Sequence, residues 1–261
     1  MTLARRAIRA AALLAALLSP LAPLAAPAAG AEWRDPTTGA VFVWVPGGRF
    51  TLGCGAWAAP CPPNESPTRV VEVKGFWIGK TEVTQGQWST LMPLDPPKKR
   101  MTPDHPVDQV TWEDAHAFLD KLNRAGHGTF RLPSEAEWEY ACRERGREIP
   151  LCGEGKTDAL AWFISNARMS MQPVATKAPN ALGLHDMNGN LYEWTEDCWH
   201  ETLDDLPADG TPQRKGDCAS HTLRGGSWGN YPNATRATTR RSDFDVKCPF
   251  TGLRLVREGD R

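Results

Sequence analysis

The stretch NALGLHDMNGNLYEWTED, residues Asn180 to Asp197, carries the strongest local signal in the chain. Side chains with oxygen donors crowd around Gly189 in this stretch; they belong to Asp186, Asn188, Asn190 and Glu193. Hard oxygen donors and turn carbonyls are the ligands that calcium prefers, although the spacing is not that of an EF-hand. The residues alone leave two readings equally open, a calcium site and an Asx-rich turn bonded to its own backbone.

Three helix starts precede that stretch, and each has the signature of a capping box. In this motif each of two side chains accepts a hydrogen bond from the backbone N–H of the other residue. The pairs are Thr84 with Gln87, Thr111 with Asp114, and Ser134 with Glu137. The second helix also ends at Gly126, a residue type that favours helix termination. The sequence therefore predicts two or three short helices in the first half of the chain.

Strand signals stand on both sides of these helices. The segment AVFVWVPGGRFTLG, residues 40–53, predicts a β-hairpin around a Pro-Gly-Gly turn, and GLRLVRE, residues 252–258, predicts a terminal strand. With 23 Gly and 22 Pro, regular structure thins out after Gly146. We expect a single α+β domain with little regular secondary structure and a loop-rich C-terminal half. Such a half needs disulfides, buried tryptophans or a bound metal to hold it together.

Charge and motif content argue against several classes of function. The chain has 30 basic and 31 acidic residues, so no overall charge attracts nucleic acid, and we expect no nucleic-acid partner. Its 6 histidines are dispersed and form no HExxH motif, which argues against a zinc or iron site built from histidine. No phosphate loop, nucleophile elbow or dinucleotide fingerprint is present.

The N-terminus has the layout of a secretory signal peptide. A basic segment, MTLARRAIRA, precedes the apolar, small-residue run AALLAALLSPLAPLAAPA. Ala29-Gly30-Ala31 then fits a small-x-small cleavage site, so we expect a cut before Glu32. This divides the chain into a signal peptide, 1–31, and one domain, 32–261. Prolines interrupt the apolar run and argue against a stable membrane span. The sequence predicts a periplasmic or secreted protein.

The cysteines agree with an oxidising compartment. There are 7, all after the signal peptide, and their spacing suggests the local pairs Cys54–Cys61, Cys142–Cys152 and Cys198–Cys218. Spacing alone does not fix the pairing. Cys248 remains unpaired in this scheme, either as a buried spare or as a reactive thiol, and we favour the first because no activating base lies near it in sequence.

A second segment, RGGSWGNYPNATRATTR, residues 224–240, resembles the wall of a site but has no cysteine, histidine or carboxylate. The residues that could line a pocket there are Ser227, Trp228, Asn230, Tyr231, Arg236 and Arg240. Four arginines in and after this segment, Arg236, Arg240, Arg241 and Arg254, could bind an anionic ligand. We favour the alternative, in which they pair with acids such as Asp243 and Asp245 and brace the loops.

Six segments, in this order, resemble the formylglycine-generating enzyme family, also called the sulfatase-modifying-factor family. They are GFWIGKTEVTQGQW, PVDQVTWEDAHAFLDKLN, FRLPSEAEWEYACR, NALGLHDMNGNLYEWTED, LRGGSW and GLRLV. The resemblance runs from about Val41 to Val256 and implies a C-type-lectin-like fold. It also implies a structural calcium ion. By position, the ligands would be the side chains of Asp186 and Glu193 and the carbonyls of Gly189 and Leu191. A second family site would begin at Asn166 and Ala167, but the loop that holds its other ligands is shortened here.

The resemblance does not carry over the family's best-known activity. In formylglycine-generating enzymes, two cysteines after the Gly-Gly-Ser-aromatic turn bind copper(I), for which thiolate is the suitable ligand. Asn230 and Thr235 stand at the matching positions, so we expect no copper and no formylglycine generation. Iron-dependent sulfoxide synthases of the family need an additional helical domain. Exported bacterial branches, among them a periplasmic tailoring protein of siderophore maturation, are nearer in size and leader.

Two functions from different classes remain. The first is a monomeric binding or regulatory module whose loops contact an exported protein, a peptide, a glycan or a small molecule. The second is an oxidative tailoring enzyme that acts on a small molecule or peptide and takes its redox group from outside. We favour the first, because catalysis needs a positioned reactive group.

Overall fold

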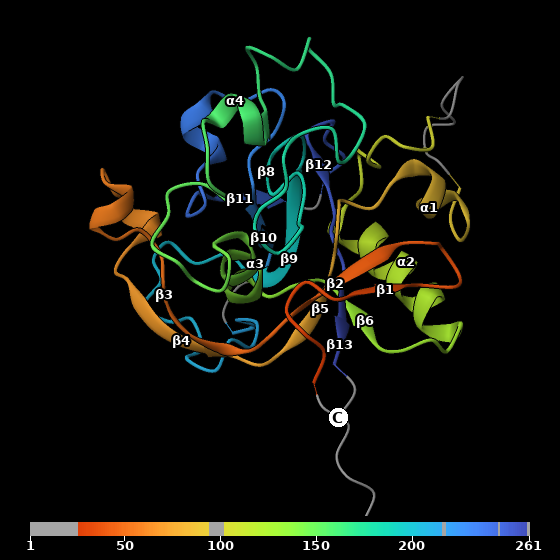
Figure 1. Ribbon diagram of the computed structural model, residues 1–261, viewed down its shortest axis with the longest axis horizontal. Coiled ribbons are helices and arrows are strands. Elements are labelled where there is room, and N and C mark those ends of the chain that lie inside the picture. Colours follow the sequence, from red (N-terminus) through yellow and green to blue (C-terminus); the bar gives the residue numbers. More distant parts are fainter. Residues whose placement is uncertain (1–25, 94–101, 216–217, 245, 260–261) are drawn as a thin grey trace, which may run out of the picture.

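The computed structural model describes residues 26–93, 102–215, 218–244 and 246–259 (Figure 1). One five-stranded sheet has the order β1-β2-β5-β13-β6, and all of its pairs are antiparallel. Its strands are β1 (Glu32–Arg34), β2 (Val41–Val45), β5 (Phe76–Gly79), β6 (Phe130–Arg131) and β13 (Val256–Glu258). The last strand of the chain therefore lies between two strands from its first half, which ties the two ends of the domain together.

The candidate site is built on a second sheet, with the order β11-β10-β9-β12. Its strands are β9 (Tyr192–Cys198), β10 (Ser220–Arg224), β11 (Arg240–Phe244) and β12 (Thr251–Gly252). All seven residues of β9 are buried, polar ones included. Two small ribbons complete the strands: β3 (Gly48–Leu52) with β4 (Arg69–Val73), and β7 (Ala161–Trp162) with β8 (Asn188–Gly189).

The helices begin where the capping boxes predict. In the described ranges they are α1 (Gln85–Ser89), α2 (Trp112–Arg124), α3 (Glu135–Cys142) and α4 (Thr157–Leu160), with 3-10 turns at Ala56–Ala58, Pro63–Glu65 and Pro232–Thr235. The capping boxes of α1, α2 and α3 each make both reciprocal hydrogen bonds. α4 follows Lys156, which makes no side-chain cap, so the sequence carried no start signal for it. None of the described helices is long and apolar enough to cross a membrane.

The predicted hairpin over residues 40–53 is wrong. Both strands form, but β2 pairs with β1 and β5, whereas β3 pairs with β4 in a separate ribbon. The chain leaves the first sheet at Pro46, which has no N–H to donate to a sheet partner. Gly47 then passes close to the β4 end, where a Cβ would lie 2.6 Å from the Val73 carbonyl oxygen. The turn therefore redirects the chain instead of folding it back on itself.

Two apolar clusters and three disulfides hold this irregular chain together. One cluster surrounds the fully buried Trp138 of α3, and the other surrounds Trp194 of β9. The disulfides are those that the spacing suggested, Cys54–Cys61, Cys142–Cys152 and Cys198–Cys218, and Cys248 is free and half-buried. Each disulfide closes a short loop in or next to the segments with least regular structure, where the chain most needs stabilisation.

Candidate functional site

Glu193, at the second position of β9, is one of the predicted calcium ligands, and its carboxylate is already occupied. Arg254 donates from Nη2 to Oε1 at 2.7 Å and from Nε to both oxygens at 2.9–3.0 Å. The indole nitrogen of Trp138 donates to Oε2 at 2.6 Å. All three side chains are fully buried. The Trp138 hydrogen bond joins this buried ion pair to α3, and no local sequence pattern indicated that Arg254 pairs with Glu193.

Asp186, the second predicted side-chain ligand, has one hydrogen-bonded carboxylate oxygen and one without a partner among the described residues. Its Oδ2 accepts a hydrogen bond from the Ala175 N–H at 2.7 Å. Its Oδ1 is buried and has no hydrogen-bond partner among the residues that the structure describes. Burial raises the pKa of this carboxyl above its ordinary value, and the nearby Arg254 acts in the opposite direction. A buried, unpartnered carboxylate oxygen is costly unless a proton or a cation reaches it.

The predicted calcium ligands therefore fit a cation unequally. Asp186 has a free oxygen, whereas both oxygens of Glu193 are taken by Arg254 and Trp138. In the described ranges, no group of three or more His, Cys, Asp or Glu side chains is placed to hold a metal ion. Calcium at this turn would depend on Asp186 and on backbone carbonyls, since Ca²⁺ takes six to eight oxygens.

A third buried carboxylate, Glu82, was missed in the sequence. It accepts hydrogen bonds from the Leu191 N–H at 2.8 Å and from Asn190 Nδ2 at 2.7 Å. Burial raises the pKa of Glu82 well above its ordinary range, and the carboxylates of Asp186 and Glu193 raise it further. Glu82 lies more than 100 residues before the turn, so no local spacing could connect the two.

Asn190 connects this buried cluster to two surface loops. It has a positive φ of 60°, a conformation that Asn tolerates better than most residues. Its Oδ1 accepts from the Gln172 N–H at 2.9 Å, and its backbone carbonyl accepts from the Trp228 N–H at 2.8 Å. One side chain and its peptide thus hold the segments 162–172 and 228–234 beside each other. We call these two segments the loop face.

The turn that begins the second segment keeps its shape through glycine. Gly225 and Gly226 have φ of 93° and 76°, and a Cβ on Gly226 would lie 2.6 Å from the Ala234 carbonyl oxygen. Beyond the turn, Asn230 Oδ1 accepts from both the N–H and the Oγ of Ser227, at 2.9 and 2.7 Å. Thr235 is buried and donates its hydroxyl to the Pro232 carbonyl at 2.9 Å. The two positions matched to the family's cysteines are therefore bonded into their own loop.

Exposed apolar side chains surround this turn. Met169 is 84% exposed, Tyr231 70% and Ile164 42%. The Ile164 N–H donates to the Asn230 carbonyl at 2.9 Å, so these side chains come from loops in direct contact. Trp228 lies at the edge of the same face, with its ring centroid 4.7 Å from that of Phe250. The loop face therefore presents three exposed apolar side chains, from residues 164, 169 and 231.

Two of the predicted pocket residues do not face a pocket. Arg240 is 1% exposed in its side chain and pairs with Glu135 through both Nε and Nη2. Arg236 forms a two-pronged ion pair with Glu65, at 2.5 and 3.0 Å. Both arginines therefore brace loops, as the favoured alternative held, but with acids far away in sequence.

Of the two acids predicted as partners, Asp243 does pair with one of the four arginines, Arg241, at 3.6 Å, and Asp245 is outside the described residues.

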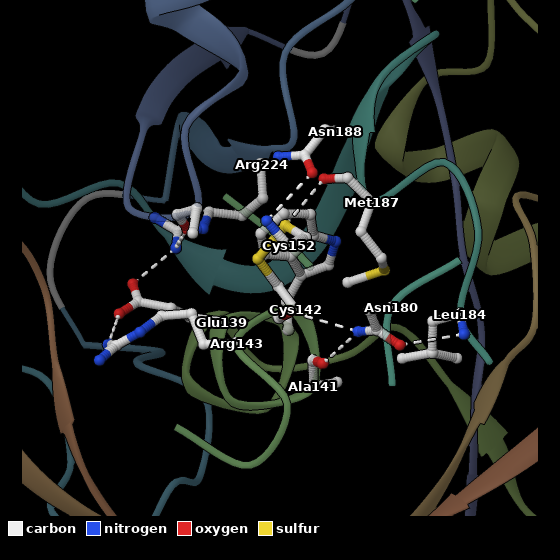
Figure 2. The surroundings of a disulfide bond; sticks show 12 residues. Glu139, Ala141, Cys142, Arg143, Cys152, Asn180, Leu184, Met187, Asn188 and Arg224 are labelled. Atoms are coloured by element: carbon white, nitrogen blue, oxygen red, sulfur yellow. Dashed lines mark hydrogen bonds and ion pairs between the residues drawn. A yellow bond between two sulfur atoms is a disulfide. The ribbon is translucent and has the colours of Figure 1, made fainter. Parts of the chain in front are cut away.

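The braces belong to a larger buried network around α3 (Figure 2). Glu139 accepts from Arg143 at 2.7 Å and from Arg224 at 2.6 Å, and all three side chains are buried. Figure 2 shows the Cys142–Cys152 disulfide next to this network, where the Cys152 N–H donates to Asn188 Oδ1 at 3.0 Å. Helix α3 is thereby fixed to β10 and to the turn before β9.

A cavity of about 860 Å³ lies elsewhere, beside the strand ends of the first sheet. Its lining includes Trp44 and Phe76 together with the Arg131–Glu137 ion pair. None of the predicted pocket residues is among its lining, so this cavity and the loop face are separate features.

The fold and these motifs agree with the comparison with known families. The Sulfatase-modifying factor enzyme 1-like domain matches residues 29–259. The chain belongs to this family. A mixed, sheet-dominated architecture with few helices accords with that membership.

Three similar proteins show the range of the family. The solved structure of PvdO from Pseudomonas aeruginosa is 28% identical, with a TM-score of 0.80 over 90% of this chain and 100% of that one. The chaperone protein LppX of Paenibacillus barcinonensis is 28% identical over 72% of this chain and 81% of its own length. A hercynine oxygenase of Mycolicibacterium smegmatis is 28% identical over 85% of this chain, which spans 62% of that longer protein.

Proposed function

We propose that this family member is an exported binding or accessory protein that uses the loop face to hold a partner and does not generate formylglycine. The observation that carries the proposal is the state of the turn. Asn230 and Thr235 are bonded into the loop at the positions where the family's copper enzymes have cysteines, and neither is a ligand for copper(I). The turn thus keeps the backbone shape of a site, while the side chains of Asn230 and Thr235 form hydrogen bonds within the loop itself.

The chemistry of the loop face favours a peptide or protein as the partner. Exposed methionine and aromatic side chains are typical of surfaces that bind protein segments, because Met adapts its shape and Tyr buries a large area at low entropic cost. Met169 and Tyr231 are such residues, and the Asn190 bonds hold their loops in fixed relation. The similarity to LppX, which is named a chaperone protein, supports an accessory role. The three disulfides support export to an oxidising compartment.

Site-specific photocrosslinking tests this proposal. A photoreactive residue replaces Met169, Tyr231 or Val70 in the full chain, expressed in the organism that makes it. Val70 is the matched control, because it is apolar, 54% exposed and on β4, outside the loop face. We expect one discrete protein or peptide adduct from positions 169 and 231 and none from position 70. Equal adducts from all three positions, or none from the loop face, would contradict the proposal.

Similarity to an oxygenase favours a second candidate, an oxidative tailoring enzyme. Such an enzyme would act on a small molecule or peptide at the same loop face, with a redox group supplied from outside the chain. Metal analysis of protein purified without chelators separates the two candidates. Stoichiometric copper or iron that is lost in a Tyr231→Ala variant would favour the enzyme, whereas calcium alone would favour the binding protein.

A further inference from the structure

We infer that the export leader is removed after Ala28, so that the mature protein begins at Ala29 and not at Glu32. The recognition sequence is Ala26-Pro27-Ala28, and the first residues of the domain that pair with a strand, Gly30 and Ala31, follow directly after Ala29. The inference rests on the proposed export, and its chemistry is the hydrolysis of one peptide bond. Water adds across the Ala28–Ala29 bond, leaving a carboxylate on Ala28 and an amine on Ala29.

The sequence around residues 26–31 offers three cleavage sites that a leader peptidase accepts. The enzyme requires small residues at the first and third positions before the cut. Ala26 and Ala28 satisfy this requirement for a cut before Ala29, Ala28 and Gly30 for a cut before Ala31, and Ala29 and Ala31 for a cut before Glu32. Composition does not separate these sites, because all three follow the same apolar run at a similar distance. The distinction comes from what each cut would remove from the folded domain.

A cut before Ala31 would remove Gly30 from the edge of the first sheet, and a cut before Glu32 would remove both Gly30 and Ala31. The Gly30 N–H donates to the Trp44 carbonyl at 3.0 Å, and the Trp44 N–H donates to the Ala31 carbonyl at 2.8 Å. These bonds continue the β1–β2 pairing by one step beyond Glu32. Trp44 is 7% exposed, so its backbone groups would lose their partners in a largely buried place. Ala31 also packs against the apolar cluster that contains Trp44.

A cut after Ala28 leaves all of these contacts intact. Residues 26–29 are exposed, whereas Gly30 and Ala31 are partly buried, so the boundary between chain end and domain falls at residues 29–30. The lost contact is a turn bond from the Ala31 N–H to the Ala28 carbonyl. The match to the family domain begins at residue 29 as well. Three separate observations, pairing, exposure and domain boundary, therefore select the same bond.

The cut also changes the cavity beside the first sheet. Ala26 and Pro27 are part of its lining. Removal of the leader takes both away, and the remaining wall comes from the folded domain, including Trp44 and Phe76.

Processing is tested on the full chain, exported from a bacterial host and recovered from the envelope or medium. Intact mass and N-terminal sequencing are done on denatured protein, so the result does not depend on whether a variant folds. We expect Ala29 as the N-terminus. In Ala28→Leu the form that begins at Ala29 should be lost, because leucine is too large for the position before the cut. In Ala31→Leu the same form should persist.

The opposite pattern overturns the inference. In that pattern the wild-type N-terminus is Glu32, Ala31→Leu blocks processing, and Ala28→Leu does not. The cut would then lie before Glu32, which the composition also allows. An uncleaved chain would overturn the inference together with the proposed export. A cut at Glu32 would leave export and the loop-face proposal standing, so the two failures are distinguishable.

Discussion

At the scale of single residues, the hydrogen bonds of the buried carboxylates around β9 determine which residue can test the calcium hypothesis. Glu193 is bonded to Arg254 and Trp138, whereas Asp186 has a free buried oxygen. A substitution at Glu193 therefore disturbs an ion pair whether or not calcium binds. Only Asp186 separates a metal role from a purely structural one.

Asp186→Asn is the direct test of a structural calcium ion. If calcium binds there, a chelator should lower the melting temperature of the wild-type protein and have no further effect on the variant. The free-energy loss would be about 3 kcal/mol at a calcium concentration of roughly 100 times Kd, because a ligand stabilises the state that binds it. Thermal melts with and without EGTA measure the effect. A wild-type protein insensitive to EGTA would remove the calcium proposal.

Glu193→Gln should be severely destabilising for a different reason. It leaves the Arg254 guanidinium buried without its carboxylate, and breaking a buried pair from one side costs about 3–5 kcal/mol. The loss should be the same with EGTA present. In the double variant with Arg254→Met, no unpaired charge remains, so the combined loss should be smaller than the sum of the two single losses. Urea unfolding of the four proteins measures this coupling, and strict additivity would contradict the ion-pair account.

At the scale of elements, the two segments of the loop face are held by side-chain and backbone bonds from one residue and not by regular structure. Asn190 Oδ1 accepts from Gln172, and its carbonyl accepts from Trp228. Loops without ladders open more easily than strands, so their protection depends on such anchoring points.

Asn190→Gly should loosen the loop face without adding backbone strain, because glycine readily adopts the positive φ at this position. We expect faster amide exchange in both 162–172 and 228–234, and a stability loss of about 1–3 kcal/mol from the unmatched buried partners. Asn64→Gly is the control, since its Nδ2 bonds to the Arg240 carbonyl outside these loops. Hydrogen exchange followed by mass spectrometry reports both. Faster exchange in one segment only would show that Asn190 does not join them.

At the scale of the whole molecule, buried carboxylates should make stability depend on pH. Asp197 is buried, and its two oxygens accept from the N–H groups of Glu135 and Gln213. Burial, and then the Glu135 carboxylate, raise the pKa of Asp197 to about 8. A raised pKa means that the folded chain holds this proton more tightly than the unfolded chain does. The stabilisation is complete below the unfolded value near 3.8 and is lost as the pH rises toward 8.

We therefore expect the melting temperature to fall as the pH rises from about 5 to about 8. Asp197→Asn cannot ionise at this position, so it should remove much of that slope. Asp209→Asn is the matched control, because Asp209 is exposed and hydrogen bonds from Thr211 lower its pKa. Melts at several pH values in one buffer series measure the slopes. A melting temperature that rises over this window would contradict the assignment.

The sequence alone determined the features whose partners are close along the chain. The capping boxes join residues three apart, and the disulfides join cysteines separated by 7, 10 and 20 positions. Such contacts need few long-range constraints, so spacing could suggest them, although the disulfide pairing itself was settled only by the structure. The six ordered segments identified the family, and the prediction that Asn230 and Thr235 stand in place of its cysteine pair also came from the sequence.

Only the tertiary structure decided which charges meet. Glu193 and Arg254 are 61 positions apart, Glu135 and Arg240 are 105 apart, and Glu65 and Arg236 are 171 apart. The separation of β2 from β3 into different sheets was decided in the same way. Buried ion pairs are selected by the low dielectric and the exact geometry of the closed core, and neither exists until distant segments have packed together.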